Sequence, residues 1–289
     1  MNTQAKWCLS VLLALMTGLY AGLMHPRQAV VLQAQEEAAP VFAAVSQEEE
    51  NLFALPSSAP GFSIEVISVE KPEVKRVLIY HSHTYEAFAQ VDGNRYQETE
   101  TWRTADSAHN MIRVGEELAA LLRSLGIQVT HDVTAFEPPS LSSAYTRSLA
   151  MLEKRIADGE NYDLYIDLHR DAYAASYGGG NTVSVAGTDV AKLMLLIGKG
   201  EGAIGQGYDV RPDWQANLAI AQAVTDELNS HTPGLCRDVC IKSGRFNQHI
   251  APACILVEAG NNRNTLSEVL AAMPYLADAI AQVLQGLRP

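Results

Sequence analysis

The chain has 289 residues, of which 47% are hydrophobic and 19% charged, a composition typical of a folded globular protein rather than a disordered one. This length is enough for one large domain or two small ones with a sizeable core. The formal net charge of −12 argues against the basic face that a nucleic-acid-binding protein normally carries. No nucleic-acid partner is therefore expected.

A long apolar run, Trp7 to Met24, lies close to the N-terminus between Lys6 and Arg27. Its roughly 18 residues are about the minimum for a helix that spans a bilayer. One positive residue before the run suits either a signal peptide or an uncleaved anchor whose N-terminus is inside the cell. Because no small-x-small cleavage site follows, we predict that residues 1–24 are a single-pass cell-membrane anchor and that the rest of the chain is extracytoplasmic.

Residues 25–72 are rich in Ala, Gln, Glu, Ser and Pro, and contain two Lys/Arg and seven Glu. They show little hydrophobic periodicity. This composition predicts a flexible acidic linker that holds a catalytic domain, residues 73–289, away from the membrane.

From about Glu73 onward, short apolar runs typical of strands alternate with helical patterns. We expect strands at 77–80, 127–131, 162–169, 191–198 and 253–260, and helices at 105–125, 136–159, 213–231 and 265–287. In the last helix, Thr265 and Glu268 have the spacing of a capping box. This alternation predicts an α/β fold of three layers, with a mostly parallel central sheet and helices on both of its faces.

Polar residues follow three of the expected strands. The first strand ends in His81, Ser82 and His83, with Glu86 one turn further on, the third ends in His169, and the last ends in Glu258. Sites in open α/β sheets gather beyond the carboxyl ends of the strands. Two strands therefore bring imidazoles, and a third brings a carboxylate, to the same edge of the sheet.

Two histidines and one carboxylate, with a fourth position open, are the usual ligands of a hydrolytic zinc ion. If a helical turn follows the first strand, His83 and Glu86 lie on one face of it. His83, Glu86 and His169 are then the expected Zn²⁺ ligands. His81 remains an alternative to His83, because a period of two sends both imidazoles to the same side. Glu258 is left to take a proton from the attacking water, whose pKa a bound zinc ion would lower.

Other residues that could bind a metal have ordinary structural interpretations. A single histidine is more often a hydrogen-bonded structural residue than a ligand, and His109, His131, His231 and His249 are interpreted in that way. Outside the apolar run there are three cysteines, an odd number, which allows at most one intrachain disulfide. The spacing of Cys236 and Cys240 is one residue longer than CxxC, so small buried residues are favoured over a zinc site; the disulfide state stays open.

Several segments resemble the stage II sporulation protein P family, membrane-anchored peptidoglycan hydrolases of endospore-forming bacteria. The resemblance covers most of residues 76–270, and the predicted anchor and linker are similar to that family's architecture. In chain order the segments are "VLIYHSHTYEAF", "GIQVTHDVTAFEPPSLSSAYTRSL", "YDLYIDLHRDA", "PGLCRDVCIKSGRFNQHIAP" and "ILVEAGNNRNTLSE". The cysteines at 236 and 240 depart from the small or apolar residues expected there.

The resemblance implies a zinc-dependent N-acetylmuramoyl-L-alanine amidase fold, and cleavage of the amide between the glycan's lactyl group and the stem peptide. It also implies endopeptidase activity on cross-links, and a role in engulfment during sporulation. The implied partners are peptidoglycan, the lytic transglycosylase stage II sporulation protein D and the membrane protein stage II sporulation protein M. By motif, "HSHTYE" supplies a histidine and Glu86, "DLHRD" supplies His169, and "VEAG" supplies Glu258.

In this mechanism Glu258 takes the proton of the attacking water and returns it to the leaving amine. Arg170 would hold substrate carboxylates through its planar fork, and Asn217, Asn247 and Gln248 would be polar groups of the substrate groove, although solvated or capping roles fit these four equally. Two alternatives remain. One is a different zinc peptidase of the cell wall, and the other is a non-catalytic wall-binding scaffold with the same fold and no metal.

Overall fold

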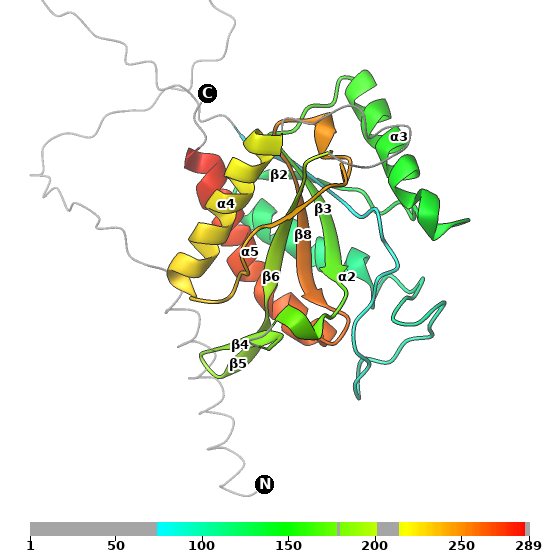
Figure 1. The fold of residues 1–289 in the computed structure, drawn as a ribbon, viewed down its shortest axis with the longest axis vertical. Helices are drawn as coiled ribbons and strands as arrows, with labels where there is room; N and C mark the ends of the chain where they lie inside the picture. The colour runs from blue at the N-terminus through cyan, green and yellow to red at the C-terminus, as the bar shows by residue number, and fades with distance from the viewer. Residues whose placement is uncertain (1–73, 178–179, 201–213, 287–289) are drawn as a thin grey trace, which may run out of the picture. The chain divides into compact units, whose positions relative to one another are not determined.

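A six-stranded sheet organises the residues that the computed structural model describes, which are 74–177, 180–200 and 214–286 (Figure 1). Its strands are β1 (Arg76–Tyr80), β2 (Gln128–His131), β3 (Leu164–Asp171), β6 (Leu193–Gly198), β7 (Cys240–Lys242) and β8 (Cys254–Asn261). The predicted anchor and linker, residues 1–24 and 25–72, lie outside the described residues. Within the described ranges no helix is both long enough and apolar enough to cross a membrane.

The strand order is β2-β1-β3-β8-β6-β7. The first four strands run parallel to one another, β6 runs antiparallel to β8, and β7 runs parallel to β6. The mostly parallel sheet expected from the alternation of strands and helices is therefore confirmed. The last residue of β1, Tyr80, pairs with Asp167 of the neighbouring β3, so the residues that follow β1 lie beside the second half of β3.

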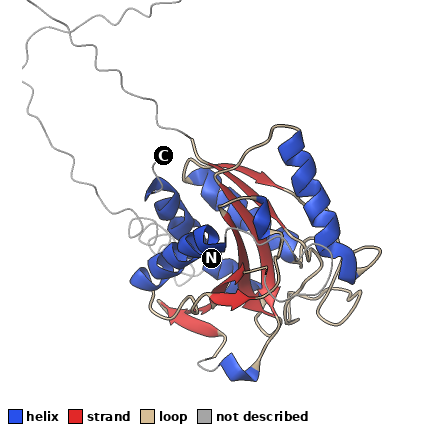
Figure 2. Ribbon diagram, turned by 45° about the horizontal axis from the view of Figure 1, so that its top comes forward, coloured by secondary structure: helices blue, strands red, loops and turns tan. Residues whose placement is uncertain are grey.

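Helices lie on both faces of the sheet, which Figure 2 shows in red between the blue helices. They are α2 (Met111–Ser124), α3 (Ala144–Ala157), α4 (Trp214–His231) and α5 (Leu266–Gly286). The side chains of β1 alternate between two cores, as the two-residue period of a strand requires. Val77 and Ile79 join the larger core with α2, α4 and α5, whereas Leu78 and Tyr80 pack with Leu152 of α3.

Two helix starts show how local hydrogen bonds set the boundaries. The expected helix at 105–125 begins only at Met111, because the side chain of Asn110 accepts a hydrogen bond from the Ile112 amide and caps the helix there. The capping box of α5 is confirmed: Glu268 N–H donates to Thr265 Oγ1 at 3.2 Å, and Thr265 N–H donates to Glu268 Oε2 at 3.0 Å.

Three short strands were missed by the sequence patterns. One is β7, with only three residues, and the others are β4 (Thr182–Val185) and β5 (Thr188–Ala191), which form an antiparallel hairpin. Ala186 and Gly187 join the hairpin with φ values of 51° and 83°. Positive φ at both central residues is the geometry of a tight hairpin turn, and Gly187 is the one residue of the pair that commonly adopts it.

One strand extends two residues further than expected, and another continues past its site residue. β3 continues through Arg170 to Asp171, with a register shift between His169 and Asp171, and β8 continues from Glu258 to Asn261. His169 and Glu258 are therefore within their strands rather than at the ends. They are direct partners in the parallel ladder, so both side chains leave the same face of the sheet.

Candidate functional site

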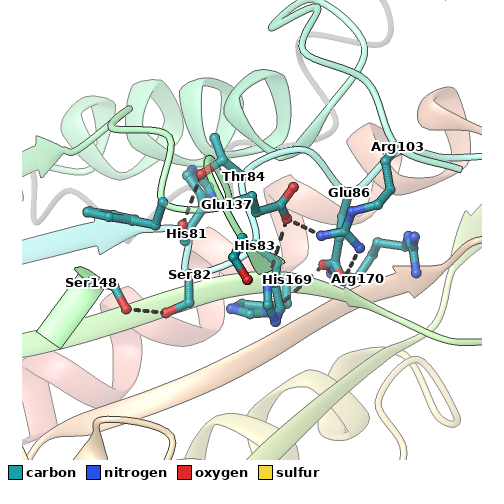
Figure 3. A network of polar contacts seen from close by, with 12 residues as sticks. His81, Ser82, His83, Thr84, Glu86, Arg103, Glu137, Ser148, His169 and Arg170 are labelled. Carbon is teal, nitrogen blue, oxygen red and sulfur yellow. Dashed lines mark hydrogen bonds and ion pairs between the residues drawn. The ribbon is translucent and has the colours of Figure 1, made fainter. Parts of the chain in front are cut away.

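Three polar side chains meet where β1 ends beside β3 (Figure 3). The imidazole rings of His83 and His169 lie with their centroids 5.2 Å apart, in an edge-to-face arrangement. Nδ1 of His169 is 3.8 Å from Oε2 of Glu86. The structure thus brings together His83, Glu86 and His169, the three residues that the sequence selected as metal ligands.

A turn, rather than a helix, carries His83 and Glu86. Residues 82–85 form the turn directly after β1, and the Glu86 amide donates to the His83 carbonyl at 3.4 Å. The backbone amide of Arg170 donates to Oε2 of Glu86 at 3.2 Å, which points that carboxylate towards β3. Glu86 also forms an isolated antiparallel bridge with Arg103, whose Nη1 lies 3.9 Å from Oε1. Contacts from both sides therefore fix Glu86.

His169 is held by a buried carboxylate on its own strand. Its Nε2 lies 2.7 Å from Oδ1 of Asp167, two residues earlier on the same face of β3. Burial lowers the pKa of His169, but Asp167, Glu86 and Glu258 outweigh burial and raise that pKa to about 9. These acidic groups give His169 an environment that favours a cation.

His81 lies elsewhere, contrary to the expectation that both imidazoles leave the strand on one side. It is fully buried, its Nδ1 donates to the Leu168 carbonyl at 2.8 Å, and its Nε2 lies 2.9 Å from Nε2 of His131. Both rings pack against Gly115 of α2. The two-residue period fails here because β1 ends at Tyr80 and the chain then turns. Both ring nitrogens of His81 therefore have partners outside the candidate centre.

The hydrogen bonds and the lowered pKa values of the His81–His131 pair together favour two neutral rings. Because the carbonyl of Leu168 can only accept, His81 carries its proton on Nδ1 and accepts the Nε2 proton of His131. Burial and the neighbouring His131 lower the pKa of His81 to about 3. Burial and Arg123 lower the pKa of His131 to about 4, against the opposing effect of Glu116 and Asp132.

Glu258 faces the same centre from β8. Its side chain is buried, and its Oε2 has no hydrogen-bond partner among the described residues. Burial, with the nearby carboxylates Glu86 and Asp171, raises the pKa of Glu258 to about 8, although His169 acts in the opposite direction. A buried carboxyl group with an unpaired oxygen and a raised pKa is typical of a residue that exchanges protons with a substrate or water.

Glu137 and Arg103 complete the surroundings of the centre, and sequence reasoning missed both. Glu137 lies in the segment after β2, and its Oε1 is 3.5 Å from Nδ1 of His83. Arg103 donates a hydrogen bond to the same oxygen of Glu137. Burial raises the pKa of Glu137, but His83 and Arg103 outweigh it and lower that pKa. No periodic pattern marks either residue, because each lies in an irregular loop that only tertiary packing places.

A cavity of about 190 Å³ opens beside this ion pair. Arg103 and Glu137 form part of its wall, so it adjoins the centre. The other lining residues are Tyr85, Thr99, Glu100, Pro138, Pro139 and Leu141.

The four residues expected in a substrate groove are buried and hydrogen-bonded within the fold instead. The Arg170 guanidinium donates to the backbone carbonyls of Ala87, Asp171 and Trp102. Hydrogen bonds to backbone groups are also made by the side chains of the other three residues, Asn217, Asn247 and Gln248. These bonds connect α3, α4 and β6 with the segment before β8. Their geometry supports a structural role.

The donor set fits a zinc ion in its chemistry. No group of three or more His, Cys, Asp or Glu side chains in the described part of the chain is already arranged as a metal site. However, Nδ1 of His83 is buried without a hydrogen bond that meets normal geometry, and Nδ1 of His169 faces Glu86 at 3.8 Å. Two donor atoms bound to one tetrahedral zinc ion are about 3.3 Å apart. A shift of about half an ångström would therefore bring Nδ1 of His169 and the Glu86 carboxylate to the separation that a shared ion requires.

The three cysteines of the described residues are free thiols. Cys236 and Cys254 are buried, and burial raises the pKa of Cys236 to about 11. They therefore behave as small apolar residues, as the sequence favoured.

Comparisons with known proteins place these features in a family. Among solved structures, an N-acetylmuramoyl-L-alanine amidase from Clostridium difficile 630 is 16% identical, with a TM-score of 0.43, and the match covers 74% of this chain and 96% of that chain. The catalytic domain of CwlV, an N-acetylmuramoyl-L-alanine amidase from Bacillus (Paenibacillus) polymyxa var. colistinus, is 12% identical, with a TM-score of 0.44 and coverage of 74% and 97%. A comparison with curated proteins gives no match. The family model for stage II sporulation protein P matches residues 27–281, so the chain belongs to the stage II sporulation protein P family.

Proposed function

We propose that this chain is a zinc-dependent peptidoglycan hydrolase, an N-acetylmuramoyl-L-alanine amidase that remodels the cell wall during sporulation. The observation that carries the proposal is the meeting of His83, Glu86 and His169 at one edge of the sheet, with the buried carboxyl group of Glu258 on the neighbouring strand. Membership of the stage II sporulation protein P family supports the sporulation role.

In this proposal His83, Glu86 and His169 would hold the metal. A bound zinc ion would polarise the scissile carbonyl and lower the pKa of the attacking water. Glu258 accepts a proton from that water and returns it to the leaving amine. The pKa of Glu258 is raised mainly by burial, and a cation beside it would lower that pKa and favour the ionised carboxylate that accepts the proton.

The remaining parts of the proposal concern where the enzyme works. Residues 1–24 would anchor it in the cell membrane, and the linker 25–72 would hold the catalytic domain outside the cytoplasm. Peptidoglycan is the proposed substrate, and stage II sporulation proteins D and M are the proposed partners during engulfment. Endopeptidase activity on cross-links belongs to the same proposal.

Metal analysis of the purified full chain, together with mass analysis of peptidoglycan digests, tests the function. The native chain should hold about one zinc ion, and its digests should contain intact stem peptides with a new L-Ala amino terminus. Glu258→Gln should keep the zinc and lose about 10²–10⁴-fold in rate. His83→Ala should lose the zinc and the activity together, because it removes a ligand and leaves the buried side of the fold intact.

Different results identify the alternatives. Products cut within the stem peptide, rather than at its junction with the glycan, would indicate another zinc peptidase of the wall. A chain that holds no zinc, and whose effect on the wall is the same after Glu258→Gln, would be a non-catalytic scaffold. A matched control is Glu116→Gln on the exposed surface of α2, which should change neither zinc content nor products.

A further inference from the structure

Asp167 is a buried charged residue to which the mechanism above gives no role. It lies in β3 with none of its surface exposed. A buried carboxylate is costly unless hydrogen bonds satisfy it. Its partners therefore show what the fold gains by keeping it.

Among the described residues, the hydrogen bonds to the Asp167 side chain come from the two segments that carry the candidate ligands. Its Oδ1 accepts from the backbone amide of Ser82 at 2.8 Å and from Nε2 of His169 at 2.7 Å. Its Oδ2 accepts from the Ser82 hydroxyl at 2.7 Å. Ser82 immediately precedes His83, so one carboxylate bonds to the turn after β1 and to the imidazole on β3.

The direction of the bond to His169 is fixed, because an ionised carboxylate can only accept. Nε2 of His169 must carry a proton and donate it to Asp167. In the neutral ring, the lone pair then lies on Nδ1, the nitrogen that faces Glu86. The bond therefore selects both the tautomer and the ring orientation that a metal ion at this centre requires.

We propose that Asp167 is a positioning residue for the metal. It holds His169 as the Nε2–H tautomer with Nδ1 presented to the ion, and through Ser82 it fixes the turn that carries His83. The inference rests on the proposed function, because it assigns the ion to His83, Glu86 and His169. Carboxylates that orient ligating histidines typically contribute about 10–100-fold to metal affinity.

A merely structural Asp167 would behave differently. Ser148 of α3 offers a matched comparison, because its hydroxyl lies 2.8 Å from the Ser82 hydroxyl in the same buried network (Figure 3) and it has no hydrogen bond to Asp167 or His169. If the network only stabilises the fold, Asp167→Asn and Ser148→Ala should both lower the melting temperature, and neither should change zinc affinity. If Asp167 positions the ligands, only Asp167→Asn changes zinc affinity.

The experiment measures the zinc affinity of the purified full chain by competition with a chromogenic chelator, and the melting temperature of the metal-free chain in parallel. Asp167→Asn has almost the same shape as the native residue and can keep an oxygen facing the Ser82 amide. We expect it to weaken zinc binding by about 10–100-fold, whereas Ser148→Ala stays within about twofold of the native affinity. An Asp167→Asn chain that is folded and binds zinc as tightly as the native chain would overturn the proposal.

A second measurement needs no variant. In ¹⁵N-edited spectra of the zinc-loaded native chain, His169 should carry a slowly exchanging proton on Nε2 and none on Nδ1. The opposite assignment would overturn the proposal even if Asp167→Asn does not fold. Neither measurement depends on hydrolysis: a chain that binds zinc as described but cuts no peptidoglycan would refute the proposed function and leave the role of Asp167 intact.

Discussion

Gly115 in the middle of α2 gives a sharp test of how the histidines at the end of β1 are packed. A Cβ atom at this position would lie 2.5 Å from Nε2 of His131, and 2.6 and 2.8 Å from Nε2 and Cε1 of His81. Carbon atoms in proteins normally stay about 3.5–4.0 Å from such neighbours, so about 1 Å of movement is needed. The two rings are hydrogen-bonded to each other, and His81 is fully buried. Neither ring can therefore move to another conformation without breaking this bond or disturbing the core.

The expected size of the effect follows from two opposing contributions. Alanine is favoured over glycine inside a helix by about 1 kcal/mol. Overpacking a filled core costs about 1–3 kcal/mol, and a strained His81–His131 hydrogen bond costs about 1 kcal/mol more. We therefore expect Gly115→Ala to lower the free energy of unfolding by about 2 kcal/mol, and the melting temperature by about 4–8 °C.

Chemical denaturation of the full chain, with Ala120→Gly as the control, measures this balance. Ala120 is on the exposed side of the same helix, so its replacement reports helix propensity alone and should cost about 1 kcal/mol. The reasoning would be refuted if Gly115→Ala were as stable as the native chain or more stable, because propensity would then dominate and the rings would have room to move.

Two further predictions concern other buried groups. Folding lowers the pKa of His131 from 6.5 to about 4, so the unfolded chain takes up a proton at this residue at a higher pH than the folded chain does. The contribution of His131 to the free energy of unfolding should therefore be fully present above pH 6.5. It should fall by up to about 3 kcal/mol as the pH drops from about 6.5 to about 4. Urea titrations at each pH should show a smaller loss for His131→Gln, which keeps a donor for His81 but cannot titrate, and an equal loss would contradict the assignment. Arg103→Ala should lower the free energy of unfolding by about 3 kcal/mol, because it leaves the buried Glu137 without its cationic partner. Arg95→Ala is the matched control, since it breaks an exposed ion pair and should leave the denaturation midpoint unchanged.

Much of the sheet could be predicted from the sequence because its central strands are buried on both faces. β3 and β8 are buried at every position, so they read as mainly apolar runs, interrupted in β3 by Asp167, that end in polar residues. The short β7 and the β4–β5 hairpin carry no such run, and their pairing depends on the elements around them. Packing against residues far apart in the sequence therefore determines these short strands, which the local sequence pattern does not predict.

The candidate site divides in the same way. His169 and Glu258 were found because they follow apolar runs on strands that the α/β alternation places side by side. Arg103 and Glu137 were not found, because they come from loops far apart in the sequence and meet only through a side-chain ion pair. Inspection of the residues at the ends of predicted strands can locate the candidate centre. It cannot identify the loop residues that surround that centre.

The choice between His81 and His83 shows what information was missing. The two residues are equivalent in the pattern HSH, and only the structure beyond β1 separates them. Gly115 leaves a space on α2 that His81 fills, and Asp167 binds the Ser82 amide and so fixes the turn that places His83 beside His169. One glycine and one buried aspartate on other elements thus assign different surroundings to two identical side chains. A substitution at Asp167 should therefore disturb the centre, whereas one at Gly115 should disturb the packing of His81 and His131, although neither residue is one of the proposed ligands.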